Sequence, residues 1–232
     1  MQIIGIVSAL LVIIIGFTER DQSMGFFDPV ALTVICVGML GALVLSSRPK
    51  DFIGTLVSLR EILPFFARYS EESDRIEAER VKLEDLWVQG KKIEAANLAE
   101  ASKYEEIRLM MDYIMSRADD AVLDNRFTAL GHRCVDRWEP VVANWEQLAK
   151  LGPAFGMVGT LTGMILLFKD FGTGDSNIGA SLSLALLSTL YGLVLGSGVA
   201  GPIGSFLSTL MNQRIQVLKR CHKTVKQLVK MG

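Results

Sequence analysis

Hydroxyl side chains lie inside two stretches of the chain that are otherwise apolar. Residues 151–168 contain Thr160 and Thr162, and residues 178–207 contain Ser183, Ser188, Thr189 and Tyr191. A hydroxyl in an apolar setting either bonds back to the carbonyl four residues earlier or offers its oxygen to water or a cation. Back-bonding is the simpler interpretation for any one of them. Taken together, on helix faces rich in small residues, they favour a polar pathway or a helix interface.

Two prolines accompany these hydroxyls. Pro153 lies near the start of the first apolar stretch, and Pro202 lies near the end of the second. A proline has no N–H, so a carbonyl of the preceding turn loses its usual donor. Inside a bilayer that carbonyl must find another partner, such as a neighbouring side chain, a water or an ion.

Small residues give both stretches a face suited to close helix contact. The first face contains Gly152, Gly156, Gly159 and Gly163, and the second contains Ser181, Ala185, Ser188 or Thr189, Gly192 and Gly196. Lipid gives little hydrophobic drive for helices to associate, so association depends on small residues that let backbones approach. We expect the helix of a partner subunit to lie against these faces.

The apolar stretches carry no Asp, Glu, Lys, Arg or His near their middle. Asp28 and Asp170 are expected at the ends of the predicted spans. An ion-driven membrane protein needs an ionisable group at depth to bind and release the ion. If this chain conducts ions, another subunit must therefore supply the carboxylate.

Metal chemistry and enzyme chemistry have no support in the sequence. The cysteines, at 36, 134 and 221, are far apart and give no metal-ligand spacing, and His132 and His222 are isolated from each other. We interpret both histidines as surface or satisfied residues. Because there is also no nucleophile and base constellation, we expect neither an enzyme nor a resident metal or cofactor.

The elements that must position the hydroxyls are membrane helices. The 232-residue chain is 50% hydrophobic and 21% charged, and the two classes are segregated along it. Residues 2–17, 29–47, 151–168 and 178–207 are each close to the length needed to cross a bilayer. A signal peptide is the alternative for the first stretch, which lacks a basic n-region and a clear cleavage site. The sequence predicts an all-α membrane protein with four transmembrane helices.

Basic residues indicate the orientation of these spans, because Lys and Arg next to a span resist translocation. The loops at 18–28 and 169–177 hold one basic residue each, whereas the segment 49–147 and the C-terminal tail are rich in them. Both termini and the long segment are therefore predicted to be cytoplasmic. The predicted domains are an N-terminal transmembrane hairpin at 1–48, a cytoplasmic helical domain at 49–147, a C-terminal transmembrane hairpin at 148–207 and a tail helix at 208–232.

The segment between the second and third spans has helical periodicity. Helices are predicted at 73–88, with Ser73 as the cap and Gly90 as the terminator, at 103–117, and at 120–147 with a bend or boundary at Pro140. The residues expected on their apolar sides are Ile76, Leu83, Trp87, Ile107, Met110, Met111, Ile114, Val122, Phe127, Leu130 and Trp138.

Two strings carry a resemblance to a known family. LGPAFGMVGTLTGMI, from Leu151, and ALLSTLYGLVLGSGVAGPI, from Ala185, resemble the third and fourth spans of the MotA and PomA stator proteins, within the MotA/TolQ/ExbB channel superfamily. GFFDPVALTVICVGMLGALVLSS, followed by RPKDF, is similar to their second span and its exit. Gly38-Met39 replaces the double glycine often seen there. Four spans favour the MotA branch over the three-span TolQ and ExbB proteins.

The resemblance implies an A subunit of an ion-driven rotary stator in the bacterial inner membrane. It implies a homopentamer around a dimer of a MotB- or PomB-like B subunit, whose membrane aspartate accepts H+ or Na+ and whose periplasmic part grips peptidoglycan. It also implies torque on the flagellar rotor and no nucleic-acid partner. At matching positions it assigns torque coupling to Pro153 and Pro202, and the ion pathway to Thr160, Ser188 and Thr189. Hydroxyls at these positions are typical of sodium-driven members.

The cytoplasmic loop departs from the flagellar pattern. Flagellar stators carry Arg and Glu residues that meet charges on the rotor protein FliG, and the loop VQGKKIEAANLAEASKYEE aligns poorly with that pattern. The candidates for contact with a rotor or another target are Lys91, Lys92, Glu94 and Glu100. The alternative is a non-flagellar motor of the same family, in Zorya-type anti-phage defence or envelope energisation. Zorya A subunits continue into a long cytoplasmic tail, so a truncated C-terminus is a further alternative, as is a passive membrane scaffold.

Overall fold

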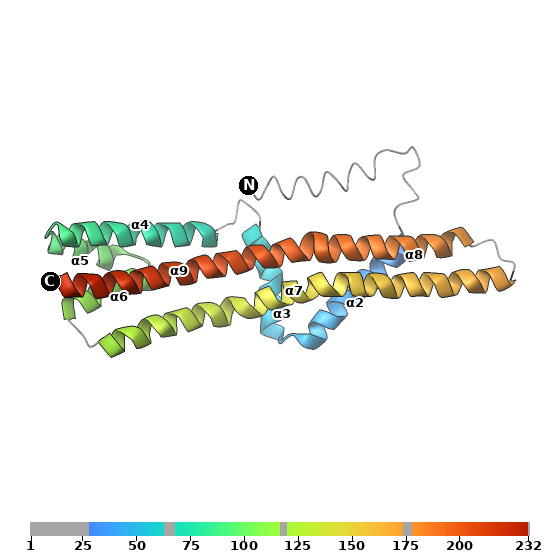
Figure 1. Ribbon diagram of the computed structural model, residues 1–232, viewed down its shortest axis with the longest axis horizontal. Coiled ribbons are helices and arrows are strands. Elements are labelled where there is room, and N and C mark those ends of the chain that lie inside the picture. The colour runs from blue at the N-terminus through green and yellow to red at the C-terminus, as the bar shows by residue number, and fades with distance from the viewer. Residues whose placement is uncertain (1–27, 63–67, 117–119, 174–177, 232) are drawn as a thin grey trace, which may run out of the picture. The chain divides into compact units, whose positions relative to one another are not determined.

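The computed structural model describes residues 28–62, 68–116, 120–173 and 178–231 (Figure 1). In chain order the elements are α2 (Pro29–Ser46), α3 (Pro49–Ile62), α4 (Arg68–Val88), α5 (Lys92–Ala101), α6 (Glu105–Ser116), α7 (Asp120–Thr173), α8 (Ile178–Leu193), the π-helical turn η1 (Val194–Ala200) and α9 (Gly201–Met231). All of these are helices, and the described residues contain no strand. The predicted all-α class is confirmed for this part of the chain.

Three helical stretches of the described chain are long and apolar enough to cross a membrane: Pro29–Ser46, Asp120–Gly172 and Ile178–Lys230. The second and third of these stretches include the spans predicted at 151–168 and 178–207, and the first matches the span predicted at 29–47 except for its last residue. The span predicted at 2–17 lies outside the described residues. The last two predicted spans are parts of longer helical stretches. α7 and the run from α8 through α9 both continue well past them.

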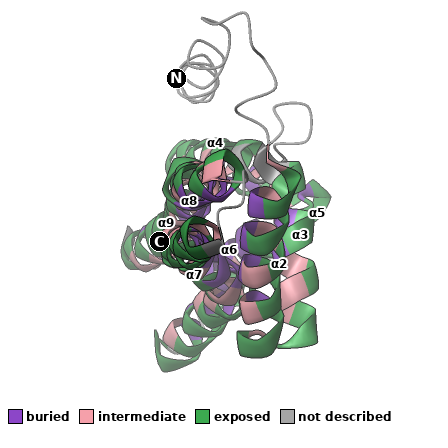
Figure 2. Ribbon diagram, turned by 90° about the vertical axis from the view of Figure 1, so that its right-hand side faces the viewer, coloured by how far each residue is buried: buried purple, intermediate pink, exposed green. Residues whose placement is uncertain are grey.

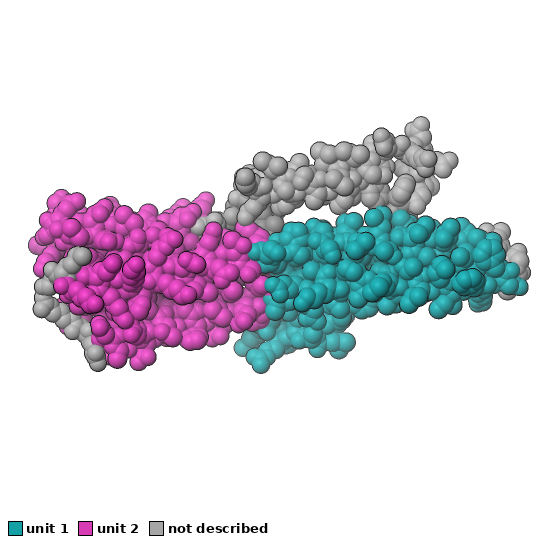
Figure 3. Space-filling model, in the orientation of Figure 1, with its two compact units in different colours: residues 1–53, 143–205 teal, residues 54–142, 206–232 magenta. Residues whose placement is uncertain are grey.

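The chain divides into two compact units (Figure 3). Unit 1 comprises residues 1–53 and 143–205, and unit 2 comprises residues 54–142 and 206–232. Each unit therefore combines segments that are distant in the sequence.

In unit 1, α2 packs against α8. Asp28 caps α2: its Oδ1 accepts hydrogen bonds from the N–H groups of Val30 (2.8 Å) and Ala31 (3.1 Å). Pro29 takes the first helical position, where its missing N–H costs nothing. Figure 2 colours the described helices by burial, and the buried residues of α2 are Ala31, Ile35, Met39 and Leu43. Their spacing of four residues is that of one helix face.

Unit 2 has a hydrophobic core to which α4, α5, α6, α7 and α9 contribute. The fully buried residues at its centre include Ile76 and Leu83 of α4 and Ile107 and Met110 of α6. The tail helix α9 completes the core with Val217, Cys221, Val225 and Leu228. Burial raises the pKa of the Cys221 thiol to about 12, so this thiol stays protonated and unreactive at neutral pH.

Charged side chains also connect α9 to other helices of unit 2. The Arg214 guanidinium lies 2.7 Å from a Glu106 carboxylate oxygen and 3.4 Å from one of Glu72. Both side chains of the shorter pair are nearly buried, at 11% and 8% exposure. Glu106 belongs to α6 and Glu72 to α4, so a single α9 side chain holds two helices.

Two further ionic clusters lie along α9. Arg80 of α4 donates to Glu77, to Glu84 (2.7 Å) and to the Thr224 hydroxyl of α9 (2.7 Å). The hydrogen bond from Arg80 holds the pKa of the Glu77 carboxyl below its usual value.

At the start of α7, Asp124 lies 2.6 Å from His222 Nε2 and 2.7 Å from Lys226 Nζ. Hydrogen bonds from Lys226 and His222 lower the pKa of the Asp124 carboxyl. His222 is thus a satisfied residue, as predicted.

The predicted helices of unit 2 are partly right. The helix predicted at 103–117 is α6, and Gly90, with φ of 78°, ends α4 as expected. Ser73 is not a cap: α4 begins at Arg68, because the Glu-containing residues before Ser73 also favour helix, and Ser73 is buried within it. Val122 is exposed, and its neighbour Leu123 takes the core position.

Pro140 does not end a helix, so of the predicted bend or boundary the boundary is wrong. α7 continues through it from Asp120 to Thr173. Trp138 and Val141 are buried on either side of Pro140, so packing holds the helix there. The carbonyl that loses its donor belongs to Asp136, an exposed residue that water can reach.

Candidate functional site

The two small-residue faces predicted from the sequence pack against each other in unit 1. A Cβ atom added to Gly152 would lie 2.5 Å from the Cα of Gly196, and one added to Gly163 would lie 2.6 Å from the backbone N of Ala185. Any larger residue at these positions would push the helices apart. We call this contact the α7–α8 seam. It consists of Gly152, Gly156, Gly159 and Gly163 of α7, with Ala185, Ser188, Gly192 and Gly196 of α8 and η1.

The seam corrects one expectation from the sequence. The small faces were expected to receive a partner's helix, but α7 and α8 use them to pack on each other. The side chains that border the seam are therefore the ones left to meet a partner.

Thr160 lies at the edge of the seam and brings oxygen atoms from both helices together. Its hydroxyl is 3.0 Å from the Gly156 carbonyl and 3.1 Å from the Ala185 carbonyl, and it is hydrogen-bonded to the Thr189 hydroxyl. Thr160 and Thr189 are both half-buried. Since the Thr160 hydroxyl has one proton for three oxygen neighbours, the cluster is rich in acceptors. Oxygen atoms of this kind are the ligands that hard cations prefer.

The other predicted hydroxyls are held by their own helices. Ser188 is fully buried, donates to the Leu184 carbonyl at 2.5 Å, and lies beneath Gly159. Thr162 is exposed and donates to the Val158 carbonyl at 2.9 Å. Ser188 and Thr162 each donate to a carbonyl of their own helix, as in the back-bonding interpretation. Thr160, in contrast, bonds both to its own helix and across the seam.

One of the two predicted coupling prolines contacts Gly196, and the other follows the π-helical turn that contains this glycine. A Cβ on Gly196 would lie 2.8 Å from Cδ of Pro153, so the proline ring packs directly on this glycine. The Gly196 carbonyl accepts a hydrogen bond from the Gly201 N–H five residues later, which is the spacing of a π-helical turn. Pro202 follows at once, and because it has no N–H it cannot continue that ladder.

Asp28 and Asp170, which were expected at the ends of the predicted spans, differ in position. Asp170, near the end of α7, accepts a hydrogen bond from Ser181 at 2.6 Å. The backbone N–H of Asp28 instead donates to the hydroxyl of Tyr191, at 3.1 Å. Tyr191 is thirteen residues after Ile178 (191 minus 178), or about 20 Å along the helix at 1.5 Å per residue. Asp28 therefore begins α2 beside the middle of the α8–η1 run, not beside the α8 end where Asp170 lies.

Gly38 has a role that the sequence did not reveal. A Cβ there would lie 2.5 Å from the Phe155 ring, so α2 approaches α7 through this glycine. The sequence showed a single glycine in place of a glycine pair, and no local pattern could identify an aromatic ring more than a hundred residues away as its neighbour.

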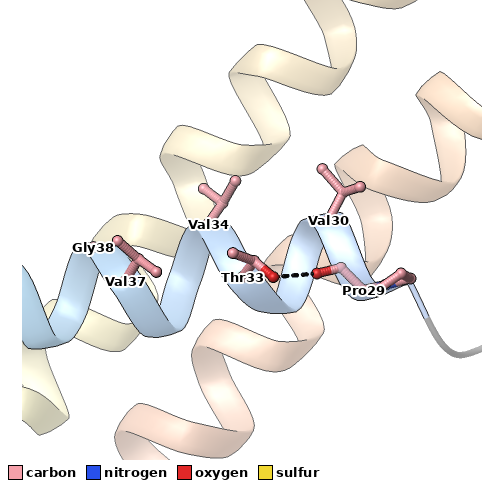
Figure 4. A pocket seen from close by; sticks show the side chains of 6 residues that line it. All are labelled: Pro29, Val30, Thr33, Val34, Val37 and Gly38. Carbon is pink, nitrogen blue, oxygen red and sulfur yellow. Dashed lines mark hydrogen bonds between the residues drawn. The ribbon is translucent and has the colours of Figure 1, made fainter.

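An apolar groove of about 600 Å³ follows the same helix (Figure 4). It is lined by Pro29, Val30, Thr33, Val34, Val37 and Gly38. The Thr33 hydroxyl donates to the Pro29 carbonyl at 2.6 Å, so it offers no proton to a ligand. This lining contains no ionisable side chain and suits an apolar neighbour.

The predicted contacts to a rotor or other target lie on α5. Lys91, Lys92 and Glu94 are exposed around its first turn, and Glu100 is exposed near its end. Lys91 lies 3.6 Å from Glu94, and the Lys92 ammonium lies 5.0 Å from the Trp87 ring centre. The four side chains are accessible but belong to two separate turns. Within the described residues, no group of three His, Cys, Asp or Glu side chains is placed to hold a metal ion.

Residues 91–220 match the MotA/TolQ/ExbB proton channel family. The chain is 27% identical over 220 residues to Motility protein A of Aquifex aeolicus (strain VF5), covering 93% of this chain and 84% of that protein. It is 38% identical over 63 residues to Chemotaxis protein PomA of Vibrio alginolyticus, covering 27% of this chain and 24% of that protein.

Two solved structures share the fold. The MotAB structure from C. jejuni matches with a TM-score of 0.81 at 14% identity, covering 99% of this chain and 89% of that chain. The flagellar MotAB stator complex from Bacillus subtilis matches with a TM-score of 0.72 at 18% identity, covering 98% and 89%. At these identities the likeness concerns the fold.

Proposed function

The chain belongs to the MotA/TolQ/ExbB proton channel family, and from this premise we propose that it is the A subunit of an ion-driven rotary stator motor. The observation that carries the proposal is the oxygen cluster around Thr160 and Thr189. It joins two apolar helices, lies at the edge of their seam, and is half-buried rather than sealed. A cation or a proton carried by water would find acceptors there.

The partner of this chain, in the proposal, is a MotB- or PomB-like B subunit. The stretches 151–168 and 178–207 contain no acidic residue, so the carboxylate that takes up the ion comes from that subunit. The fold shared with two MotAB structures supports such a pairing. We propose a homopentamer around a dimer of the B subunit, in the bacterial inner membrane, with both termini cytoplasmic and with the domain boundaries predicted from the sequence.

Gly196 suggests how ion passage is coupled to movement. Pro153 packs on this glycine, which lies inside the π-helical turn η1 (Val194–Ala200), and Pro202 follows two residues after the end of that turn. A π-helical turn can give way to the α-helical register, and in this proposal η1 adopts either arrangement. We propose that ion binding near Thr160 and Thr189 shifts η1 between them, and that H+ and Na+ are both candidate ions.

Co-expression with a single-span partner tests the pairing. The full-length chain, purified with a B subunit whose span carries an aspartate, is expected to form one complex with an excess of A over B by native mass spectrometry. Changing that aspartate to asparagine is expected to leave the complex intact and abolish ion flux in proteoliposomes. No complex with any single-span subunit encoded in the same genome would contradict the proposal.

A non-flagellar motor of the same family is the second candidate, and the surface of α5 favours it. Trp87 is partly covered by Lys92, and Val88 and Ile93 are 68% and 78% exposed, so the α4–α5 turn offers apolar as well as charged contacts. Deleting the gene in its native host separates the two. Flagellated cells that no longer swim would identify the rotor as the target, while unchanged swimming with no second stator set would identify another target.

A further inference from the structure

A carboxylate lies at the end of the α7–α8 seam that is nearest to the connection between the two helices. The helices run antiparallel, and the seam brings Gly163 of α7 against Ala185 of α8. Asp170 follows Gly163 by seven residues (170 minus 163), which places both on one face of α7. Asp170 accepts a hydrogen bond from Ser181 of α8 at 2.6 Å. This pair is therefore a further contact on the same seam.

The Asp170 contact lies in line with the oxygen cluster of Thr160 and Thr189. Thr160 is ten residues before Asp170 in α7 (170 minus 160), or about 15 Å at 1.5 Å per residue. Thr189 is eight residues after Ser181 in α8 (189 minus 181), or about 12 Å by the same rise. Both helices therefore lead from the carboxylate to the oxygen cluster along the edge of one seam.

Asp170 is the acidic residue of α7 that is nearest to this cluster along the helix. No Asp or Glu lies between it and Thr160, and in the other direction the first is Glu146, fourteen residues before Thr160 (160 minus 146). The adjacent Lys169 is exposed and lies about 100° around the helix from Asp170. The seam face itself therefore carries negative charge at this end.

The surroundings of Asp170 are suited to attracting a cation. Its side chain is half-buried, and Phe168 and Phe171 of the same helical turn are 67% and 60% exposed. Apolar side chains beside a charge exclude water, so the charge is less screened and concentrates counter-ions near it. An ionised carboxylate has about four acceptor positions, so it can accept from Ser181 and contact a cation at the same time.

We propose that Asp170 captures the transported cation at the non-cytoplasmic mouth of the pathway and delivers it to the oxygen cluster of Thr160 and Thr189. Ser181 positions the carboxylate on the seam face. This inference rests on the proposed function, which places the α7–α8 connection on the non-cytoplasmic side. It adds a residue of this chain to a pathway for which the B subunit supplies the carboxylate at depth.

Ion uptake by right-side-out membrane vesicles tests the proposal. The vesicles contain the full-length chain in complex with its B subunit, either as the parent or with Asp170→Asn. The asparagine keeps an oxygen that can accept from Ser181 but removes the charge. Uptake is measured against the external concentration of the ion that the parent carries, with radioactive sodium for Na+ and a pH-sensitive dye for H+.

The expected change is in the half-saturating concentration and not in the maximal rate. Asp170→Asn should raise the half-saturating concentration about two- to fivefold, less than the effect of a whole charged cleft because one charge is removed. External choline chloride should narrow the difference between parent and variant, because salt screens the attraction. Glu146→Gln, which removes an exposed carboxylate from another part of α7, is the control and should match the parent.

The outcomes separate this inference from the proposed function. If Asp170 only joined the two helices, Asp170→Asn would match the parent in half-saturating concentration and in thermal unfolding temperature. That result would overturn the capture role and leave the proposed function standing. A lower maximal rate at an unchanged half-saturating concentration would also overturn it, because Asp170 would then act after capture. Absence of Na+ and H+ uptake by the parent complex would contradict the proposed function itself, and this inference with it.

Discussion

At the scale of single residues, Gly163 and Gly172 lie in the same helix but differ in their surroundings. A side chain at Gly163 would meet the backbone of Ala185, whereas nothing lies within 4 Å of the position at Gly172. We expect Gly163→Ala to destabilise the chain by about 1–3 kcal/mol, the usual cost of overpacking. Thermal unfolding in detergent, followed by circular dichroism, measures this.

Gly172→Ala is the matched control. Alanine favours helix by up to about 1 kcal/mol over glycine, so this variant should be as stable as the parent or slightly more so. Equal destabilisation by both substitutions would show that the seam has no special need for glycine.

Thr160 and Thr162 allow a second comparison, because both lie in the same turn of α7 but their hydroxyls have different partners. Thr160→Ala should change the sodium dependence of motor output, because it removes an oxygen from the cluster shared with Thr189. Thr160→Ser keeps the hydroxyl and should retain most of the output. Motor speed against sodium concentration, in cells or in tethered-motor assays, is the measurement.

Thr162→Ala is the control, since this exposed hydroxyl bonds only to Val158 of its own helix among the contacts described above. If Thr160→Ala and Thr162→Ala gave the same sodium dependence as the parent, Thr160 would be a back-bonded residue without a place on the ion path.

At the scale of elements, η1 is the irregular part of the α8–α9 run. Pro202→Ala would restore the missing N–H and allow the run to adopt the α-helical register. We expect the variant to assemble normally and to produce less torque, because one of two competing registers is then favoured. Complex yield by size-exclusion chromatography and rotation under load measure the two effects.

The three prolines of these long helices supply the comparison. Pro153→Ala should act like Pro202→Ala, because Pro153 packs on Gly196. Pro140→Ala, in a different part of α7, should leave torque unchanged. Full torque in both the Pro153 and Pro202 variants would argue against the coupling role.

The sequence predicted some elements better than others, for physical reasons. Membrane helices and glycine faces are local patterns with a fixed period, so the span at 29–47 and the two small-residue faces could be predicted, but not that these faces pack on each other. The helix boundary predicted at Pro140 is absent, because tertiary packing around Trp138 and Val141 overrides the local preference of proline. The register of η1 could not be predicted, because a π-helical turn depends on contacts with α7 and not on a sequence period.

The candidate site was predicted in its residue types but not in its connections. Thr160 and Thr189 are 29 residues apart, and only the packing of α7 on α8 brings them together. The same packing buries Ser188 and fills the faces expected for a partner's helix. Likewise, the contact between Arg214 and Glu106 joins residues 108 positions apart, beyond the range of any local pattern.

At the scale of the whole molecule, α9 contributes to both units, and in unit 2 one of its ionic contacts is nearly buried. Glu106→Gln would remove the nearer of the two carboxylates that face the Arg214 guanidinium and leave Glu72, which lies farther away. Removing one partner of a buried pair costs about 3–5 kcal/mol, and we expect a loss near the lower end because Glu72 remains. Chemical denaturation of the full chain, followed through its tryptophan fluorescence, measures the loss.

Glu105 is the matched control, one residue away on α6. It lies 3.4 Å from Arg133, and both side chains are more than half exposed. Glu105→Gln should cost about 0–1 kcal/mol, as for other surface ion pairs. A similar cost for both variants would mean that water screens the Arg214 pair as well.

The contribution of α9 to the core of unit 2 also has a consequence for biosynthesis. The ribosome releases α4, α5 and α6 long before it releases Val217, Cys221, Val225 and Leu228, which close the core around Ile107 and Met110. Until then these apolar side chains lack their final neighbours and are open to chaperones and proteases. Unit 2 therefore matures only after the membrane segments have been translated, and its resistance to protease should arise last as the nascent chain grows.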